Sequence, residues 1–232
     1  MIPVVLASQS PARRQILTAS GIDPVIVVSH VDEAAIEASF AGDVPELTCA
    51  LSEAKARAVI ESLRTRTPPQ LLAEADAAGP GADGARTVVL IAGDSLLELD
   101  GRPVGKPGTA ERTREVWTAM AGRWATLHTG HTVAVLDVDP GRRTCEVRDL
   151  RSARSSTGVL MGRPSEAELE AYIATEEPFG VAGALTIDGF GGAFVDRLDG
   201  DHLTVLGLSL PLVRRLVTDM GLFWPDLWSS RR

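Results

Sequence analysis

The chain has 232 residues, of which 44% are hydrophobic, so it can bury a sizeable core and we expect a single domain over residues 1–232. Its formal net charge of −8 excludes the broad basic surface with which proteins bind duplex nucleic acid, so no stable nucleic-acid partner is expected. The apolar start is short and no run approaches the roughly 20 apolar residues of a membrane span, so no membrane partner is expected either.

The chain opens with an apolar run over residues 2–7 that predicts a buried strand. A helix follows, because Ser10 suits its N-cap position and Gly21 the left-handed position just past its end. The free N–H groups at the start of this helix, together with Arg13 and Arg14, indicate an anion site. On these residues alone, two arginines in contact with water remain the simpler interpretation.

The next elements are a second strand over residues 25–28 and a helix over residues 47–63. Residues 63–87 are rich in Gly, Pro, Ala and acidic residues, so we expect an insertion loop that is mostly flexible, with room for a short helix over 71–78. The insertion could cover a cleft or have no role.

A continuously apolar run over residues 87–92 predicts a central strand buried on both faces. It ends at Asp94, in the position where open α/β sheets gather ligands. Asp100 and Gly101 then indicate a hairpin turn, and two further strands are predicted over 126–138 and 145–161. Three later helices are indicated by their N-caps, Thr109, Ser165 and Ser209. Together these elements predict an α/β fold with a mixed sheet.

Two acidic residues stand where a metal could bind. Asp94 and Glu33 both follow predicted strands, and two such carboxylates can hold one Mg²⁺ or Mn²⁺. Taken alone, Glu33 is as readily a solvated loop acid, and Asp32 competes for the same role. His30 has no second His or Cys at the spacing of a zinc site. The sequence also contains no nucleophile elbow, P-loop or Rossmann motif.

Lysine and cysteine are both scarce in this chain. Of 23 basic Lys and Arg residues, only Lys55 and Lys106 are lysines, which indicates positions that need a compact ammonium, although two leftover surface lysines are the simpler interpretation. Cys49 and Cys145 are far apart and lack the spacing of a disulfide framework, which predicts reduced thiols and a cytoplasmic location.

Several short motifs follow one another in a fixed order. Residues 6–14 read LASQSPARR, residues 31–33 VDE, residues 53–56 EAKA, residues 93–95 GDS and residues 105–107 GKP. The later motifs occupy residues 120–122, 128–130, 182–183, 189–191 and 205–211. In this order and spacing, and over nearly its full length, the chain resembles the Maf family of nucleoside triphosphate pyrophosphatases.

The resemblance implies a mixed, twisted central sheet flanked by helices, similar to inosine triphosphatases, with a cleft at the strand ends. It also implies a divalent-metal-dependent cut between the α- and β-phosphates of a nucleoside triphosphate. By the matching motifs, Glu33 and Asp94 would hold Mg²⁺ or Mn²⁺, and Asp94, Lys55 and Lys106 would be catalytic.

The same resemblance assigns substrate binding to Ser8, Ser10, Ala12, Arg13 and Asp188. Ala12 stands where family members carry Arg or Trp, and Asp188 where they carry Gln or Glu, and both positions are expected to contact the base. An ionised Asp188 accepts hydrogen bonds but cannot donate them, which weakens any transfer of a thymidine or uridine preference and suits a guanine-type edge better.

The family resemblance further implies a homodimer. Two other functions stay open at the level of sequence. One is a non-catalytic nucleotide-binding regulator linked to septum formation, and the other is a structural α/β domain without a ligand. The enzyme is favoured because the chain keeps every charged residue expected for hydrolysis.

Overall fold

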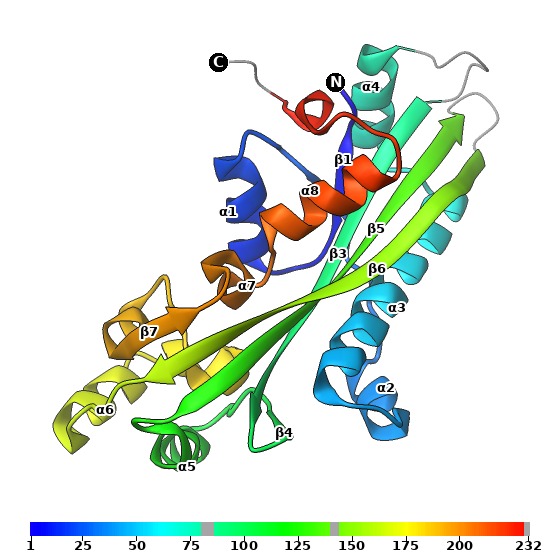
Figure 1. The fold of residues 1–232 in the computed structure, drawn as a ribbon. Coiled ribbons are helices and arrows are strands. Elements are labelled where there is room, and N and C mark those ends of the chain that lie inside the picture. The colour runs from blue at the N-terminus through cyan, green and yellow to red at the C-terminus, as the bar shows by residue number, and fades with distance from the viewer. Residues whose placement is uncertain (80–85, 140–143, 230–232) are drawn as a thin grey trace.

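A mixed β-sheet runs through the molecule and contains seven strands among the residues described. The computed structural model describes residues 1–79, 86–139 and 144–229 (Figure 1). The strand order is β2-β1-β3-β5-β6-β7, with β4 paired to β3 at one edge. The strands are β1 (Val4–Ala7), β2 (Val25–Ile26), β3 (Arg86–Leu99), β4 (Arg102–Val104), β5 (Trp124–Asp139), β6 (Thr144–Met161) and β7 (Val195–Asp199).

Strand direction divides the sheet into two parts. β1 is parallel to its neighbours β2 and β3. The pairs that follow in the strand order, β3 with β5, β5 with β6 and β6 with β7, are antiparallel. The long strands β3, β5 and β6 twist along the length of the molecule and connect its two ends (Figure 1). The expected α/β class with a mixed, twisted sheet is therefore confirmed.

Helices cover both faces of this sheet. α3 and α4 lie on one face, α1, α7 and α8 on the other, and α5 and α6 lie at the far end of the long strands (Figure 1). No helix in the described part of the chain is long and apolar enough to cross a membrane. The α-helices are α1 (Pro11–Ala19), α2 (Glu33–Ser39), α3 (Val44–Thr65), α4 (Pro69–Ala78), α5 (Ala110–Met120), α6 (Glu166–Ile173), α7 (His202–Leu206) and α8 (Leu210–Asp219).

The apolar run of β3 is buried on both faces, as its sequence predicts. Val88 and Leu90 belong to the core that packs against α3 and α4. Val89 and Ile91 belong to the separate core formed with α1 and α8. Because successive side chains of a strand point to opposite faces, one strand serves both cores.

β3 extends further than its apolar pattern predicts. We expected the strand to end at residue 92, but it continues through the polar residues and pairs with β5 as far as Glu98. Asp94 therefore lies inside a strand rather than at its end. The parallel neighbour β1 stops opposite Ala92, and β4 begins to pair only at Leu97. Between these points, this edge of β3 has no strand neighbour among the described residues.

The insertion over residues 63–87 is only partly a loop. It contains α4, in which Leu71 and Ala75 are fully buried and Leu71 belongs to the core formed with the sheet. The short helix for which the sequence left room over 71–78 is therefore present and begins two residues earlier, at Pro69. Residues 80–85 of the insertion lie outside the described residues. The second strand is also shorter than predicted. The expected helix caps are confirmed at Ser10, Thr109, Ser165 and Ser209.

Candidate active site

Asp94, Lys55 and Glu33 meet on the face of β3 that α3 covers, next to the stretch where β3 has no strand neighbour among the described residues. The Lys55 ammonium contacts Asp94 Oδ1 and lies 2.8 Å from Glu33 Oε1. Asp94 and Lys55 are only 6% and 8% exposed, whereas the Glu33 side chain is 42% exposed. One cation therefore joins a buried carboxylate on the sheet to a carboxylate at the surface.

A close approach between α3 and β5 brings Lys55 over Asp94. Gly130 of β5 pairs with Asp94 across the sheet. A Cβ atom at Gly130 would lie 2.2 Å from the backbone of Thr48 in α3, closer than real Cβ atoms come. The missing side chain therefore allows α3 to lie directly against the sheet, with Lys55 two turns further along the helix.

The N-cap of α2 explains why Glu33, and not the adjacent Asp32, contacts Lys55. Asp32 is the N-cap of α2 and accepts a hydrogen bond from the Ala35 N–H at 3.0 Å. Glu33 begins the helix and points to Lys55. Of the two adjacent acids, Asp32 thus holds the helix end and Glu33 contacts the cation.

Arg13 ties together the segments that surround the site. Its Nε donates to Gly207 O at 2.7 Å, and its two terminal nitrogens donate to Ser8 Oγ at 3.2 Å and Ser95 Oγ at 2.9 Å. Burial lowers the pKa of Arg13, and the charges of Asp94 and Glu33 act in the opposite direction. The guanidinium stays charged because its unperturbed pKa lies far above neutral pH.

Ser8 and Ser10 form the turn that leads from β1 into α1. Ser8 Oγ accepts from the Ser10 N–H at 3.2 Å as well as from Arg13. Ser10 Oγ accepts from the Arg13 N–H at 3.4 Å and so caps α1. Both hydroxyls help to fix the start of the helix that carries Arg13.

Charges around Glu33 favour its ionised form. Burial alone would raise the pKa of Glu33, but its hydrogen bond to Lys55 and the charges of Lys55, Lys106 and Arg13 bring this pKa below its ordinary value. Lys106 is exposed and follows β4, so it acts on the site through its charge. Glu37, one turn after Glu33 on α2, has its pKa raised by burial and by the charges of Asp94 and Glu33.

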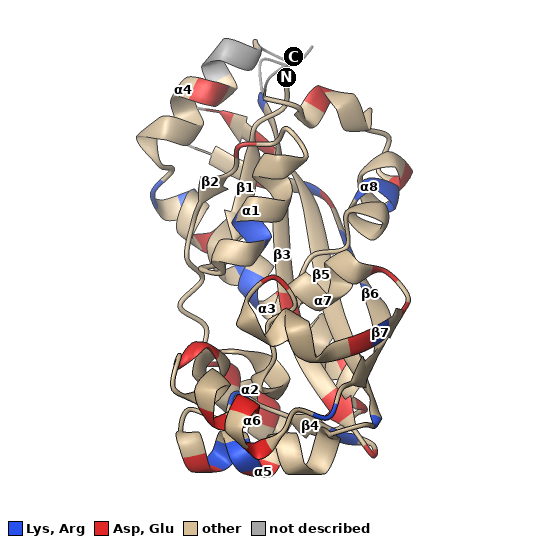
Figure 2. Cartoon of the chain, turned by 90° about the vertical axis from the view of Figure 1, so that its left-hand side faces the viewer, with Lys and Arg blue, Asp and Glu red and all other residues tan. Residues whose placement is uncertain are grey.

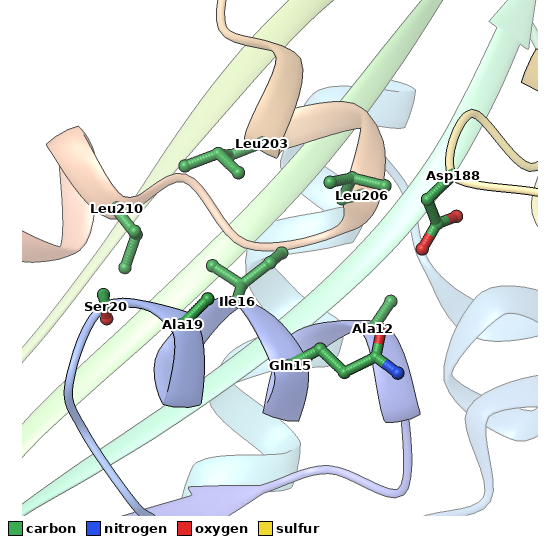
Figure 3. A pocket seen from close by; sticks show the side chains of 9 residues that line it. All are labelled: Ala12, Gln15, Ile16, Ala19, Ser20, Asp188, Leu203, Leu206 and Leu210. Carbon is green, nitrogen blue, oxygen red and sulfur yellow. The ribbon is translucent and has the colours of Figure 1, made fainter.

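A pocket of about 490 Å³ lies beside the site, between α1 and the segment that carries α7 and α8. Ala12 and Asp188, the two positions expected to contact a base, both line it. Figure 3 shows Asp188 projecting from its own loop near Ala12, while Ile16, Leu203 and Leu206 supply an apolar wall. Ala12 and Asp188, which lie 176 residues apart in the sequence, therefore line the same pocket.

Metal ligation at this site would rest on few groups. In the described part of the chain, no three His, Cys, Asp or Glu side chains come together as a metal cluster. Glu33 and Asp94 nevertheless contact the same cation, so their oxygens can reach a common point. Carboxylate oxygens are the ligands that Mg²⁺ prefers, and Mg²⁺ commonly uses only one or two of them.

Lys and Arg residues do not gather in one region of the chain in the view of Figure 2. Among the segments described there, basic and acidic residues are interspersed around α5 and α6. This distribution agrees with the net charge of −8. A polyanionic ligand would therefore depend on a few concentrated cations such as Arg13 and Lys55.

Sequence reasoning missed four residues that shape the site. Ser95 and Gly207 hold Arg13, Glu37 adds a third acidic group nearby, and Glu177 contacts the loop of Asp188. Ser95 could have been found, since it follows Asp94 in the same motif. Gly207 could not, because it binds Arg13 through its carbonyl group, which every residue possesses.

The chain is similar to known proteins over nearly its whole length. A family model described as Maf-like protein matches residues 3–220. A nucleoside triphosphate pyrophosphatase of Mycobacterium sp. (strain JLS) is 44% identical over 229 residues, covering 97% of this chain and 98% of the relative. The protein of that name in Rhodococcus opacus (strain B4) is 43% identical over 232 residues, covering 99% of this chain and 98% of the relative. These similarities extend over the whole arrangement described above.

Proposed function

The chain belongs to the Maf-like protein family, and we propose that it is a nucleoside triphosphate pyrophosphatase that hydrolyses the bond between the α- and β-phosphates. The products are a nucleoside monophosphate and pyrophosphate. The observation that carries the assignment of the site is the buried contact between Lys55 and Asp94 of β3. The same Lys55 ammonium also contacts Glu33.

The residues of the site divide the chemistry between them. Asp94 is buried and acidic, and it orients and deprotonates the attacking water. Lys55, Lys106 and Arg13 neutralise the negative charge that grows on the departing pyrophosphate. Ser8, together with N–H groups at the start of α1, binds phosphate oxygens.

A divalent cation, Mg²⁺ or Mn²⁺, completes the proposed site. Glu33 and Asp94 fit such an ion because both are oxygen donors that already reach one cation, Lys55. When bound, the metal supplies Lewis-acid neutralisation of phosphate oxygens. Glu33 and Asp94 are the residues that would hold it.

The base enters the pocket between Ala12 and Asp188 in this proposal. Ala12 leaves space where a larger side chain would contact the base. The oxygens of the Asp188 side chain accept hydrogen bonds from N–H groups, which favours a guanine-type edge with two adjacent donors. Modified bases fit the same description as long as they keep those donors.

The proposal is tested by pyrophosphate release. Purified protein with Mg²⁺ or Mn²⁺ is assayed against canonical, 7-methylated and 5-modified nucleoside triphosphates. Inactivity across the panel, combined with tight nucleotide binding, would instead support the alternative of a non-catalytic regulator of cell division.

Asp94→Asn tests the catalytic assignment. The amide keeps the shape but cannot take a proton, so we expect a loss of about 10²- to 10⁴-fold in kcat. Asp32→Asn is the matched control, since Asn caps a helix nearly as well as Asp and activity should stay near that of the wild type. Full activity in Asp94→Asn, with the fold intact by circular dichroism, would show that another residue carries the reaction.

We also propose a homodimer in the cytoplasm. The homodimer rests on the family, and the location rests on Cys49 and Cys145, which are both free thiols. Light scattering coupled to size exclusion measures the oligomeric state directly.

A further inference from the structure

The carboxylate of Glu177 makes three hydrogen bonds to the loop that carries Asp188. Glu177 Oε1 accepts from the Gly191 N–H at 3.0 Å, and Oε2 accepts from the Phe190 N–H at 3.1 Å. The Thr186 hydroxyl also donates to Oε1. Both oxygens are thus engaged, and the partners lie on both sides of Asp188.

The loop is also packed closely around this carboxylate. A Cβ atom at Gly189 would lie 2.4 Å from Glu177 Oε2. A Cβ atom at Gly191 would lie 2.6 Å from the Tyr172 hydroxyl and 2.7 Å from Thr186 O. The glycines therefore let the main chain approach Glu177 and Tyr172, which limits where Asp188 can stand.

Tyr172, which the loop contacts at Gly191, is anchored in the core. Tyr172 is 2% exposed, and its hydroxyl lies 3.4 Å from the Thr186 hydroxyl. Its ring packs edge-on against Trp117 with centroids 6.0 Å apart and contacts Phe194 at 5.7 Å. The Asp188 loop is thereby fixed to the end of the molecule that contains α5 and α6, whereas Ala12 belongs to α1.

Glu177 acts as an ionised acceptor rather than as a space-filling side chain. Burial alone would raise the pKa of Glu177, but the hydrogen bonds from Thr186, Gly191 and Phe190 lower it below its ordinary value. Hydrogen bonds to a charged group are stronger than those between neutral groups. Neutralising this residue would weaken all three contacts together.

We propose that Glu177 is a positioning residue for base selectivity, which acts by holding the main chain of the 186–191 loop so that Asp188 faces the pocket beside Ala12. This inference rests on the proposed function, because it takes the pocket as the base site. Glu177 itself does not line the pocket.

The test compares Glu177→Gln with the wild type in the binding of non-hydrolysable α,β-methylene nucleoside triphosphates. Gln keeps the volume but turns an NH₂ group toward a backbone N–H. We expect affinity for the preferred base to fall about tenfold, the ranking of bases to flatten, and affinity for base-free ribose 5-triphosphate to stay unchanged. With hydrolysable substrates, KM should rise while kcat stays the same.

Further variants separate positioning from general damage. Glu176→Gln changes the exposed neighbouring residue and should leave binding unaltered. Glu177→Asp keeps the charge and both acceptor oxygens and should recover part of the selectivity. If Glu177→Gln fails to fold, Thr186→Val removes one donor to the same carboxylate and should weaken base binding to a smaller extent.

A double-mutant cycle decides the outcome. In an Asp188→Ala background, Glu177→Gln should have no further effect on base ranking. Equal losses for base-free and base-bearing analogues, no change in ranking, or an unchanged effect without Asp188 would each overturn the proposal. Absence of pyrophosphate release by the wild type would refute the proposed function separately, since analogue binding requires no turnover.

Discussion

At the scale of single residues, the site depends on a lysine buried between two carboxylates. Removing Lys55 and Asp94 from water costs free energy that their attraction recovers only with good geometry, and apolar replacements are often no less stable. A structural role alone would therefore not require this pair. A compact ammonium can reach two carboxylates with one nitrogen, whereas a planar guanidinium presents a fork. A role in binding and cleaving a polyanionic substrate would explain why this buried pair of Lys55 and Asp94 is present.

His131 makes stability depend on pH. This residue is fully buried, and its Nε2 accepts the Ser209 N–H at 2.8 Å at the start of α8. Burial, followed by the charge of Arg13, lowers the pKa of His131 to about 3. The unfolded chain therefore gains a proton near pH 6.5 that the folded protein does not bind until about pH 3, so falling pH favours unfolding across this window.

We expect the free energy of unfolding to drop by about 2 kcal/mol between pH 6.5 and 5 through His131 alone. Urea titrations at several pH values measure this slope. His131→Gln keeps an acceptor for the Ser209 N–H but does not titrate, so its stability should vary less with pH. An identical slope in the two proteins would show that His131 is not the group responsible.

Motifs predicted which residues gather at the site but not how they are held. The sequence alone predicts that Asp94, Lys55 and Glu33 belong to one site, because their charges and their order along the chain indicate that they bind the same anionic ligand. One of the three partners of the Arg13 side chain is a carbonyl 194 residues away, and no local pattern encodes such a contact. Glu177 was missed for the same reason, because it binds backbone N–H groups that carry no sequence signature.

At the scale of elements, the contact between α3 and β5 is the most demanding. Gly130→Ala would force a Cβ atom to within 2.2 Å of Thr48 backbone atoms, which cannot move without shifting α3. We expect a destabilisation of roughly 1–3 kcal/mol or more, with loss of activity as Lys55 moves away from Asp94. Urea unfolding and pyrophosphate release measure the two effects.

Gly180→Ala is the matched control, since a Cβ atom there meets no other atom within 4 Å. It should leave stability near that of the wild type. If Gly130→Ala were equally harmless, the helix would have to be packed less closely on the sheet than described here.

Element types were easier to predict than element lengths. Caps such as Ser10 and Ser209 identified helix starts because each side chain satisfies a specific N–H group. The predicted length of β3 is shorter than the observed one, because the apolar run ends at Ala92 while pairing with β5 continues to Glu98. A strand is held by its neighbour's hydrogen bonds, which the apolar pattern does not report.

At the scale of the whole molecule, the proposed metal is not expected to hold the fold together. Lys55 joins the carboxylates of Glu33 and Asp94, so metal removal should leave the fold unaffected while ending catalysis. We expect EDTA to abolish pyrophosphate release and to change Tm by less than about 2 °C, which corresponds to under ~1 kcal/mol.

EDTA saturated beforehand with Mg²⁺ serves as the control and should affect neither quantity. A large fall in Tm on chelation would mean that the ion is structural. Sustained turnover would mean that the basic residues alone carry the reaction.

Among the described residues, a short edge of β3 between β1 and β4 has no strand partner, and this bears on how the protein behaves in a crowded solution. Exposed strand edges are templates on which other chains assemble into aggregates. This one extends only from the end of β1, opposite Ala92, to the first β4 pair at Leu97. It is flanked by strands and bears the charge of Asp94. Because Ala92, Asp94 and Leu96 are also buried, this stretch offers an invading polypeptide too little length and too little exposed backbone to dock.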